Sequence, residues 1–142
     1  MKTVKEVLET KGFDFATVAP DTWVLEAARQ MSDQGIGSLL VMRGADLLGV
    51  VTERDVAYKL VCAGKSPVDT AVKEIMSSHV LCVTPQHTVE ECMALMTDKR
   101  VRHLPVVEDG RIVGIVSIGD AVKAMVAQQQ FIIEQLENYI SS

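Results

Sequence analysis

The chain of 142 residues is long enough for one compact domain, which buries roughly two-thirds of its unfolded surface. Its formal net charge is −5, so no global basic field favours nucleic acid as a partner. Hydrophobic residues make up 48% of the sequence and aromatic residues 4%, which predicts an aliphatic core. No membrane-length apolar run and no apolar signal region occur, so we expect a cytoplasmic protein without a membrane partner.

The cysteines and histidines do not form a recognisable metal or disulfide pattern. Cys62, Cys82 and Cys92 are odd in number and lack CxxC spacing. This pattern predicts reduced thiols, with Cys92 on a core face, in place of a disulfide framework or zinc site. The histidines form no i, i+4 ligand pair either, so we expect no bound metal.

The sequence repeats itself, and each copy predicts the same element order, β-α-β-β-α. Residues 18–55 align with residues 83–120 at one offset and without a gap. In each copy an amphipathic helical pattern is followed by two apolar runs around a Gly-containing turn, which predicts a hairpin. In copy one we expect a strand at 16–18, a helix at 24–31, strands at 38–42 and 47–51, and a helix from near Asp55. In copy two we expect a strand at 81–83, a helix at 89–96, strands at 104–107 and 112–116, and a helix from near Asp120.

A long helix is predicted at the C-terminal end. Apolar residues recur there at roughly helical spacing from Val122 to Ile140. We expect the stretch from Phe131 to Ile140 to pack on another subunit, because it lies beyond the second copy. The chain therefore divides into a first repeat with an N-terminal helix (1–66), a second repeat (67–127) and a C-terminal helical extension (128–142).

One motif occurs in both copies, at residues 49–55 and 114–120: Gly, two apolar residues, Thr or Ser, two further residues and Asp. A hydroxyl three residues before an acidic residue is typical of a helix capping box, and this structural role alone would explain both copies. The same geometry suits a nucleotide. A helix N-terminus attracts phosphate, a hydroxyl can donate to it, and a carboxylate can accept from both ribose hydroxyls.

The duplicated motif, the offset and the element order resemble a tandem pair of CBS domains (named for cystathionine β-synthase) over residues 3–127. The resemblance implies an α+β fold of two pseudo-symmetric repeats packed through their sheets into one globular module, with a C-terminal helix. It also implies a stand-alone, non-catalytic regulatory module that binds an adenosine nucleotide (AMP, ADP, ATP or NAD) between the repeats and senses energy or cofactor state. A homodimer and a separate regulated enzyme or transporter are the implied partners.

The resemblance assigns residues to two clefts. In the first, Asp120 would bind the ribose and Ser117 a phosphate. The other residues expected there are Lys11, Ala16, Ile36 and Gly37 around the base and Arg102 and His103 at phosphate. The last two belong to a basic run that could equally be a solvated helix end.

In the second cleft, Asp55 would bind the ribose and Thr52 a phosphate. The residues expected to hold the base are Met76, Ser77, Leu81 and Val101. Arg54 would supply a cation to this cleft or pair with a surface carboxylate instead.

Two further function classes are weighed against nucleotide sensing. A ligand-free dimeric interaction scaffold is the alternative, in which both motifs are only helix caps and the chain regulates a partner protein. We expect no enzyme, no catalytic residue and no catalytic cofactor, because the sequence has no nucleophile elbow, HExxH or P-loop. A nucleic-acid module is disfavoured by the negative charge and the scarcity of aromatic residues.

Overall fold

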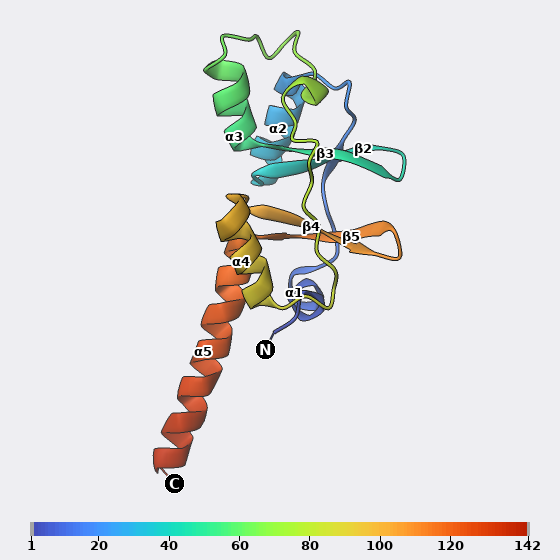
Figure 1. Ribbon diagram of the computed structural model, residues 1–142. Helices are drawn as coiled ribbons and strands as arrows, with labels where there is room; N and C mark the ends of the chain where they lie inside the picture. The colour runs from blue at the N-terminus through green and yellow to red at the C-terminus, as the bar shows by residue number, and fades with distance from the viewer. Residues whose placement is uncertain (1, 142) are drawn as a thin grey trace. The chain divides into compact units, whose positions relative to one another are not determined.

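The computed structural model describes residues 2–141, the last of them by its backbone alone, and the chain forms two compact units (Figure 1). The middle unit is Phe15–Leu81, and the terminal unit combines Met1–Asp14 with Cys82–Ser142. The units are therefore offset from the sequence repeats. The N-terminal helix belongs with the second-copy elements, and residues 67–81 belong with the first copy.

The middle unit contains a three-stranded sheet and four short helical segments. These are β1 (Thr17–Val18), α2 (Val24–Gln34), β2 (Ser38–Arg43), β3 (Asp46–Thr52), α3 (Glu53–Asp55), the π-helix η1 (Val56–Val61) and the 3-10 helix η2 (Val72–Glu74). The strand order is β1-β2-β3, with β1 parallel and β3 antiparallel to β2. Helix α2 stops at Gly35, whose φ of 64° is a left-handed conformation that glycine adopts without steric cost.

The core of the middle unit forms between α2 and the sheet. Val24, Ala27 and Met31 recur on one face of α2 and are buried against Leu39 and Val41 of β2. The first four residues of β2 are all buried, which is typical of a strand covered on both faces. The helical pattern predicted for residues 24–31 and the hairpin that follows it are confirmed.

The terminal unit combines one hairpin with three helices. These are α1 (Val4–Lys11), α4 (Val89–Lys99), β4 (His103–Glu108), β5 (Arg111–Ser117) and α5 (Ile118–Ser141). Strands β4 and β5 are antiparallel, and their turn has φ values of 53° at Asp109 and 75° at Gly110, as a tight hairpin requires. The strand predicted at residues 81–83 is reduced to one parallel bridge from Val83 to Val106.

Helix α1 is fixed to the terminal unit by backbone hydrogen bonds and by packing. The amide of Val4 donates to the carbonyl of His87 at 2.8 Å, and Lys5 donates to Pro85 at 2.9 Å. Val7 packs with Val89, Ala121 and other apolar residues of α4 and α5. These contacts explain why the N-terminal helix joins the second-copy elements.

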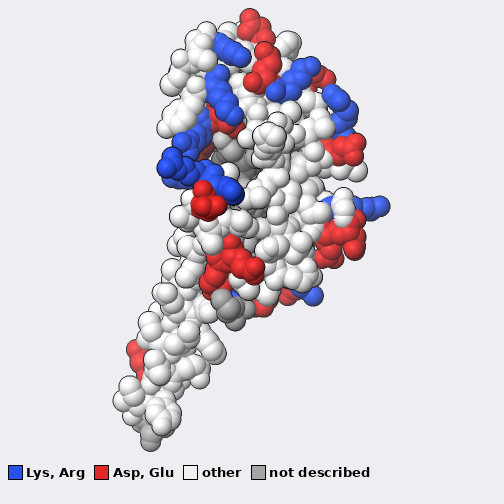
Figure 2. All heavy atoms as spheres, viewed as in Figure 1, with Lys and Arg blue, Asp and Glu red and all other residues white. Residues whose placement is uncertain are grey.

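Helix α5 is the long C-terminal helix that the sequence predicted. Its first turns bury Ala121 and Ala124, whereas its apolar side chains from Phe131 onward are exposed. Figure 1 shows its C-terminal half extending beyond the rest of the terminal unit, and Figure 2 shows few charged side chains on it. Among residues 2–141, no helix is both long and apolar enough to span a bilayer.

The α+β architecture with two similar halves is confirmed. The two hairpins share even an irregularity, since the register shifts between Val41 and Met42 in one and between Val106 and Val107 in the other. Copy one differs in its second helix, where α3 has only 3 residues and continues as a π-helix. The packing of the two repeats through their sheets stays a prediction.

Candidate functional site

The two repeated motifs form two strand-to-helix corners. Corner one is Thr52–Asp55, between β3 and α3, and it is a complete capping box. The amide of Asp55 donates to Thr52 Oγ1 at 3.2 Å, and the amide of Thr52 donates to Asp55 Oδ2 at 2.9 Å. The hydroxyl of Thr52 also donates to Asp55 Oδ2, at 3.1 Å. The structural role considered for this motif is therefore confirmed.

Corner two is Ser117–Asp120, between β5 and α5, and it repeats the same reciprocal bonds. The amide of Asp120 donates to Ser117 Oγ at 3.1 Å, and the amide of Ser117 donates to Asp120 Oδ2 at 2.8 Å. Both aspartates thus fix the first turn of a helix, and both lie partly buried at the end of a strand.

The two carboxylates have lysine partners of different origin. Lys59 Nζ lies 3.1 Å from Asp55 Oδ1, one helical turn along the same segment, and its side chain is 49% exposed. Lys11 of α1 lies 2.6 Å from Asp120 Oδ2 and also donates to the carbonyl of Ile115 at 2.7 Å. The Lys11 side chain is 31% exposed and therefore less exposed than Lys59, whereas the two aspartate side chains are similarly buried, at 18% for Asp120 and 13% for Asp55.

The pKa of Asp120 lies below the ordinary aspartate value. Burial alone would raise that pKa, but the hydrogen bond from the Lys11 ammonium and the one from the Ser117 amide together outweigh it. Asp120 is therefore a stable carboxylate acceptor at neutral pH, as binding of hydroxyl groups would require.

The glycine of each motif allows another segment to approach the strand closely. A Cβ on Gly49 would lie 2.6 Å from the carbonyl oxygen of Ser77 and 2.7 Å from Met76 Sδ. A Cβ on Gly114 would lie 2.9 Å from a terminal carbon of Leu8, in α1. The same position thus accommodates the 76–77 segment in the middle unit and α1 in the terminal unit.

Each corner is joined by a hydrogen bond to the segment that precedes the first hairpin strand. The amide of Glu53 donates to the carbonyl of Gly37 at 3.0 Å, and that of Ile118 donates to the carbonyl of Arg102 at 2.8 Å. Ile36 and Gly37 therefore lie beside corner one, and Arg102 and His103 lie beside corner two. His103 also pairs with Ser117 across the β4–β5 ladder.

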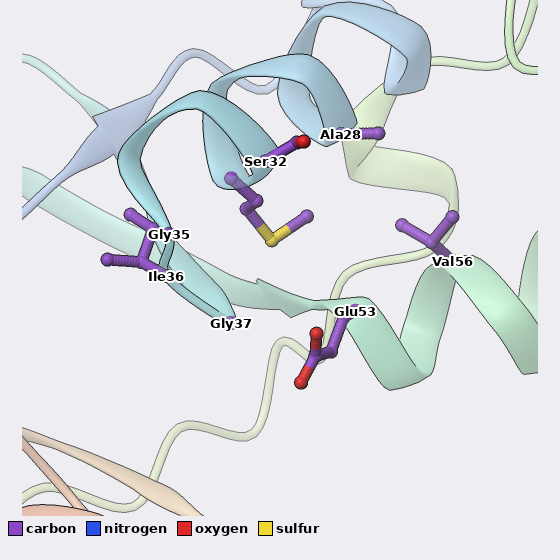
Figure 3. Close-up of a pocket in the computed structure, with 8 residues that line it drawn as sticks. Ala28, Ser32, Gly35, Ile36, Gly37, Glu53 and Val56 are labelled. Atoms are coloured by element: carbon purple, nitrogen blue, oxygen red, sulfur yellow. The ribbon is translucent and has the colours of Figure 1, made fainter.

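A hollow of about 480 Å³ lies next to corner one, within the middle unit (Figure 3). Its lining comes from the C-terminal half of α2, the three residues after it, and the start of α3 and η1. The lining residues are Ala28, Met31, Ser32, Gly35, Ile36, Gly37, Glu53 and Val56. Figure 3 shows the side chains of Glu53 and Val56 across the hollow from Ala28 and Ser32 of α2. Two residues expected at the base, Ile36 and Gly37, line this hollow.

The other predicted residues are divided between the units. In the middle unit, Ser77 exchanges two backbone hydrogen bonds with Val50 of β3, at 2.9 and 3.0 Å, and Ala16 accepts one from Leu40 at 3.0 Å. The guanidinium carbon of Arg54 lies 5.1 Å from the ring centre of Tyr58. Leu81 is the last residue of the middle unit, whereas Val101 belongs to the terminal unit. Each predicted cleft draws residues from both units, so its assembly stays a prediction.

Sequence reasoning missed three residues at these corners. Lys59 could have been found, because an i, i+4 lysine commonly pairs with an aspartate on a helix. Glu53 and Val56 line the hollow only because the chain turns back at the corner. Within the described residues, no group of three His, Cys, Asp or Glu side chains is placed to hold a metal ion.

Comparison with known proteins identifies the family of both repeats. The family model of the CBS domain matches residues 4–61 and 72–127, one match for each copy. The CBS domain-containing protein CBSX3, mitochondrial, of Arabidopsis thaliana is 35% identical over 97% of this chain and 71% of its own length.

Two solved structures are more similar in sequence. The CBS domain structure NE2398 is 46% identical, with a TM-score of 0.85 over 88% of this chain and 98% of that one. A candidate signal-transduction protein with CBS domains from Burkholderia ambifaria MC40-6 is 44% identical to this chain. Its TM-score is 0.87, over 90% of this chain and 96% of that one. With both copies of its repeat matched, the chain belongs to the CBS domain family.

Proposed function

We propose that the chain is a non-catalytic regulatory module that binds an adenosine nucleotide, either AMP, ADP, ATP or an NAD-type dinucleotide, and senses energy or cofactor state. The observation that supports this most is the hollow beside corner one. Its volume of about 480 Å³ lies in the range of ligand sites. Several of its lining residues are apolar, and Asp55, whose carboxylate could accept from vicinal hydroxyls, lies in sequence between the lining residues Glu53 and Val56.

In the middle unit, the base would enter the hollow between Met31, Ile36 and Val56, where apolar side chains suit an aromatic ring. The ribose hydroxyls would bind Asp55 in exchange for Lys59. That lysine side chain is half exposed, so releasing it costs little. The Glu53 carboxylate favours hydrogen-bond donors at the hollow and repels phosphate. The hydrogen bond from the Glu53 amide to Gly37, at the start of corner one, supports this arrangement. The role of Ile36 and Gly37 opposite Asp120 stays a prediction.

In the terminal unit, we propose that corner two binds the ribose through Asp120 and a phosphate through Ser117. Lys11 lies at the carboxylate itself, and Arg102 and His103 lie at the start of the neighbouring strand. These basic residues favour the phosphate part of a nucleotide there. The nucleotide can shift the conformation of the protein only by its affinity difference between states. The signal would pass to a separate enzyme or transporter.

The direct test is thermal unfolding of the full chain with AMP, ADP, ATP and NAD in turn. A nucleotide at 100 times its dissociation constant should stabilise the fold by about 2.7 kcal/mol. Asp55→Asn and Asp120→Asn should each reduce this gain, whereas Asp98→Asn should not, because the Asp98 side chain is 73% exposed outside both corners. If no nucleotide stabilises the protein, or if both corner variants keep the full gain, the proposal is wrong.

One observation favours the second candidate, a ligand-free dimeric scaffold. Both aspartates already complete a capping box and an ion pair, which is all that a structural motif needs. Mass spectrometry of small molecules released from the denatured protein separates the two. A co-purifying adenine nucleotide supports the sensor, and its absence together with an unchanged melting temperature supports the scaffold.

We also propose a cytoplasmic location. The three cysteines are free thiols in the structure, which suits a reducing compartment. Fractionation of cells that express the full chain tests this proposal, which a membrane or extracellular pool would contradict.

A further inference from the structure

A regular apolar stripe runs along the exposed side of α5. Its positions are spaced alternately by four and three residues, which is the heptad pattern of a coiled-coil seam. The stripe consists of Val122, Val126, Gln129, Ile133, Leu136 and Ile140. We call these six residues the α5 seam.

The α5 seam is not covered by the described part of the chain. Val126 and Leu136 are each 58% exposed, and Ile140 is 82% exposed. Ile133, in the middle of the distal half, is 46% exposed. The buried side of the helix lies at Ala121 and Ala124, so the seam begins where α5 is already fixed to the terminal unit.

We propose that the α5 seam pairs with the same seam of a second copy, as a parallel two-stranded coiled coil. In one register, the a positions are all β-branched (Val126, Ile133 and Ile140), and the d positions are Val122, Gln129 and Leu136, so the distal heptad combines β-branched a residues with Leu at d. Such a distribution favours two parallel strands over three or four. The proposal concerns a dimer interface and does not depend on nucleotide binding.

The charges of α5 agree with self-association. After Lys123, the charged residues of the helix are Glu134 and Glu137, and neither belongs to the seam. Figure 2 shows correspondingly little charge on this part of the molecule. In a parallel pair, Glu137 would face Ile132 of the second copy, so no like charges meet across the seam.

Gln129 selects the parallel orientation. In a parallel pair its amide meets the same amide of the other copy, and each can donate to and accept from the other. In the antiparallel pair it would face Ile133 and leave two enclosed amides unpaired. That pairing would add exposed Lys123–Glu137 ion pairs, which contribute less than two unpaired amides cost.

The area that the α5 seam can bury suits a weak dimer. A fully buried aliphatic side chain removes roughly 60–120 Å² of accessible surface. About half of this remains to be covered at the seam and at the flanking Ile132 and Tyr139, which are 49% and 82% exposed. With eight such side chains in each copy, the pair would bury roughly 500–1,000 Å², below or at the minimum for a stable specific interface. We therefore expect a dimer that dissociates measurably on dilution.

Sedimentation equilibrium of the full chain over a wide concentration range tests the seam. The wild-type protein should fit a monomer–dimer equilibrium. Ile133→Lys should raise the dissociation constant by about 100-fold, because it places a charge from each copy in an apolar layer. Asn138→Lys adds the same charge on the opposite face and should leave the constant nearly unchanged. Circular dichroism of both variants checks that they are folded.

Disulfide trapping tests the orientation. In a Cys62→Ser background, Gln129→Cys should form a disulfide-linked dimer under mild oxidation, since the two introduced thiols face each other only in a parallel pair in register. Asn138→Cys is the matched control and should not. A monomer at all concentrations, a dimer that survives Ile133→Lys, a trimer or tetramer, or equal linkage in the control would each overturn the proposal.

Discussion

The two corners have one motif and different surroundings. At corner one, the glycine lies under the 76–77 segment and the lysine partner of the aspartate is one helical turn away. At corner two, α1 provides both the packing partner of Gly114 and the lysine, although Lys11 and Asp120 are 109 residues apart in sequence.

This difference separates what the residues of the motif determine from what neighbouring segments of the fold contribute. The capping boxes are the same because three-residue spacing determines them. The lysines and the packing partners differ because they come from whichever segment passes the corner. Corner two is therefore coupled to α1, whereas corner one is complete within the middle unit. The following predictions test that distinction, beginning with the largest expected effect.

The two motif glycines should differ in their tolerance of alanine. A Cβ at Gly49 meets the backbone carbonyl of Ser77 at 2.6 Å, which can move only with the 76–77 segment that is hydrogen-bonded to Val50. At Gly114 the contact at 2.9 Å is the flexible end of Leu8. We expect Gly49→Ala to lower the free energy of unfolding by about 3 kcal/mol and Gly114→Ala by about 1 kcal/mol.

Urea unfolding of both variants measures this difference. Gly119→Ala is the matched control, because its Cβ would find its nearest neighbour, Ser117 Oγ, at 3.6 Å, an ordinary contact. This control should be neutral or stabilising by about 0.5–1 kcal/mol. Equal losses at Gly49 and Gly114 would contradict the view that backbone contacts tighten corner one.

Removing each lysine should have unequal effects. Lys11→Met leaves Asp120 partly buried without its cation, and we expect a loss of about 1–2 kcal/mol in the free energy of unfolding. Lys59→Met removes an i, i+4 partner whose own side chain is half exposed, with an expected loss of about 0.3–0.5 kcal/mol. Chemical unfolding at neutral pH compares them, and a larger effect of Lys59→Met would disprove the coupling of corner two to α1.

Acid should reduce the contribution of Asp120 at corner two to the free energy of unfolding. Because the folded state lowers the pKa of Asp120, its stabilising contribution is present above the unfolded pKa of about 3.9 and is lost as pH falls through the folded value. Stability of the wild type should therefore decrease below about pH 4. Asp120→Asn should flatten part of that decrease, and Lys11→Met should do so too. Unfolding curves measured across this range show the effect, and unchanged slopes in both variants would refute it.

Thiol labelling compares the accessibility of cysteines in the two units without changing their sequence. Cys62 of the middle unit is exposed, whereas burial in the terminal unit, with Glu91 and Glu90 nearby, raises the pKa of Cys92 to about 11. Since the thiolate is the nucleophile, native iodoacetamide labelling near pH 8 should modify Cys62 first and Cys92 only on unfolding. Burial also raises the pKa of Cys82, which should react slowly. Mass spectrometry of digests follows each site, and equal rates at Cys62 and Cys92 would show that the terminal unit opens readily.

Much of the fold could be predicted because it depends on short-range patterns. The spacing of Val24, Ala27 and Met31 predicted α2, and the duplicated hydroxyl–aspartate spacing predicted both capping boxes. The apolar residues at helical spacing near the C-terminal end, although interrupted by three glutamines, predicted α5. The second helix of copy one was expected to begin near Asp55 but starts at Glu53 and becomes a π-helix after 3 residues. Helix boundaries depend on competing hydrogen bonds that apolar spacing does not record.

The sequence by itself determined the repeat, the element order and the two corners, because each depends on residues within one helical turn or one hairpin. Only the tertiary structure decided that Leu8 packs on Gly114, that Lys11 reaches Asp120 and that Ile36 and Glu53 line the same hollow. Such contacts form when the chain closes over long loops, and they depend on shape and burial across the whole unit. No local spacing in the sequence specifies them.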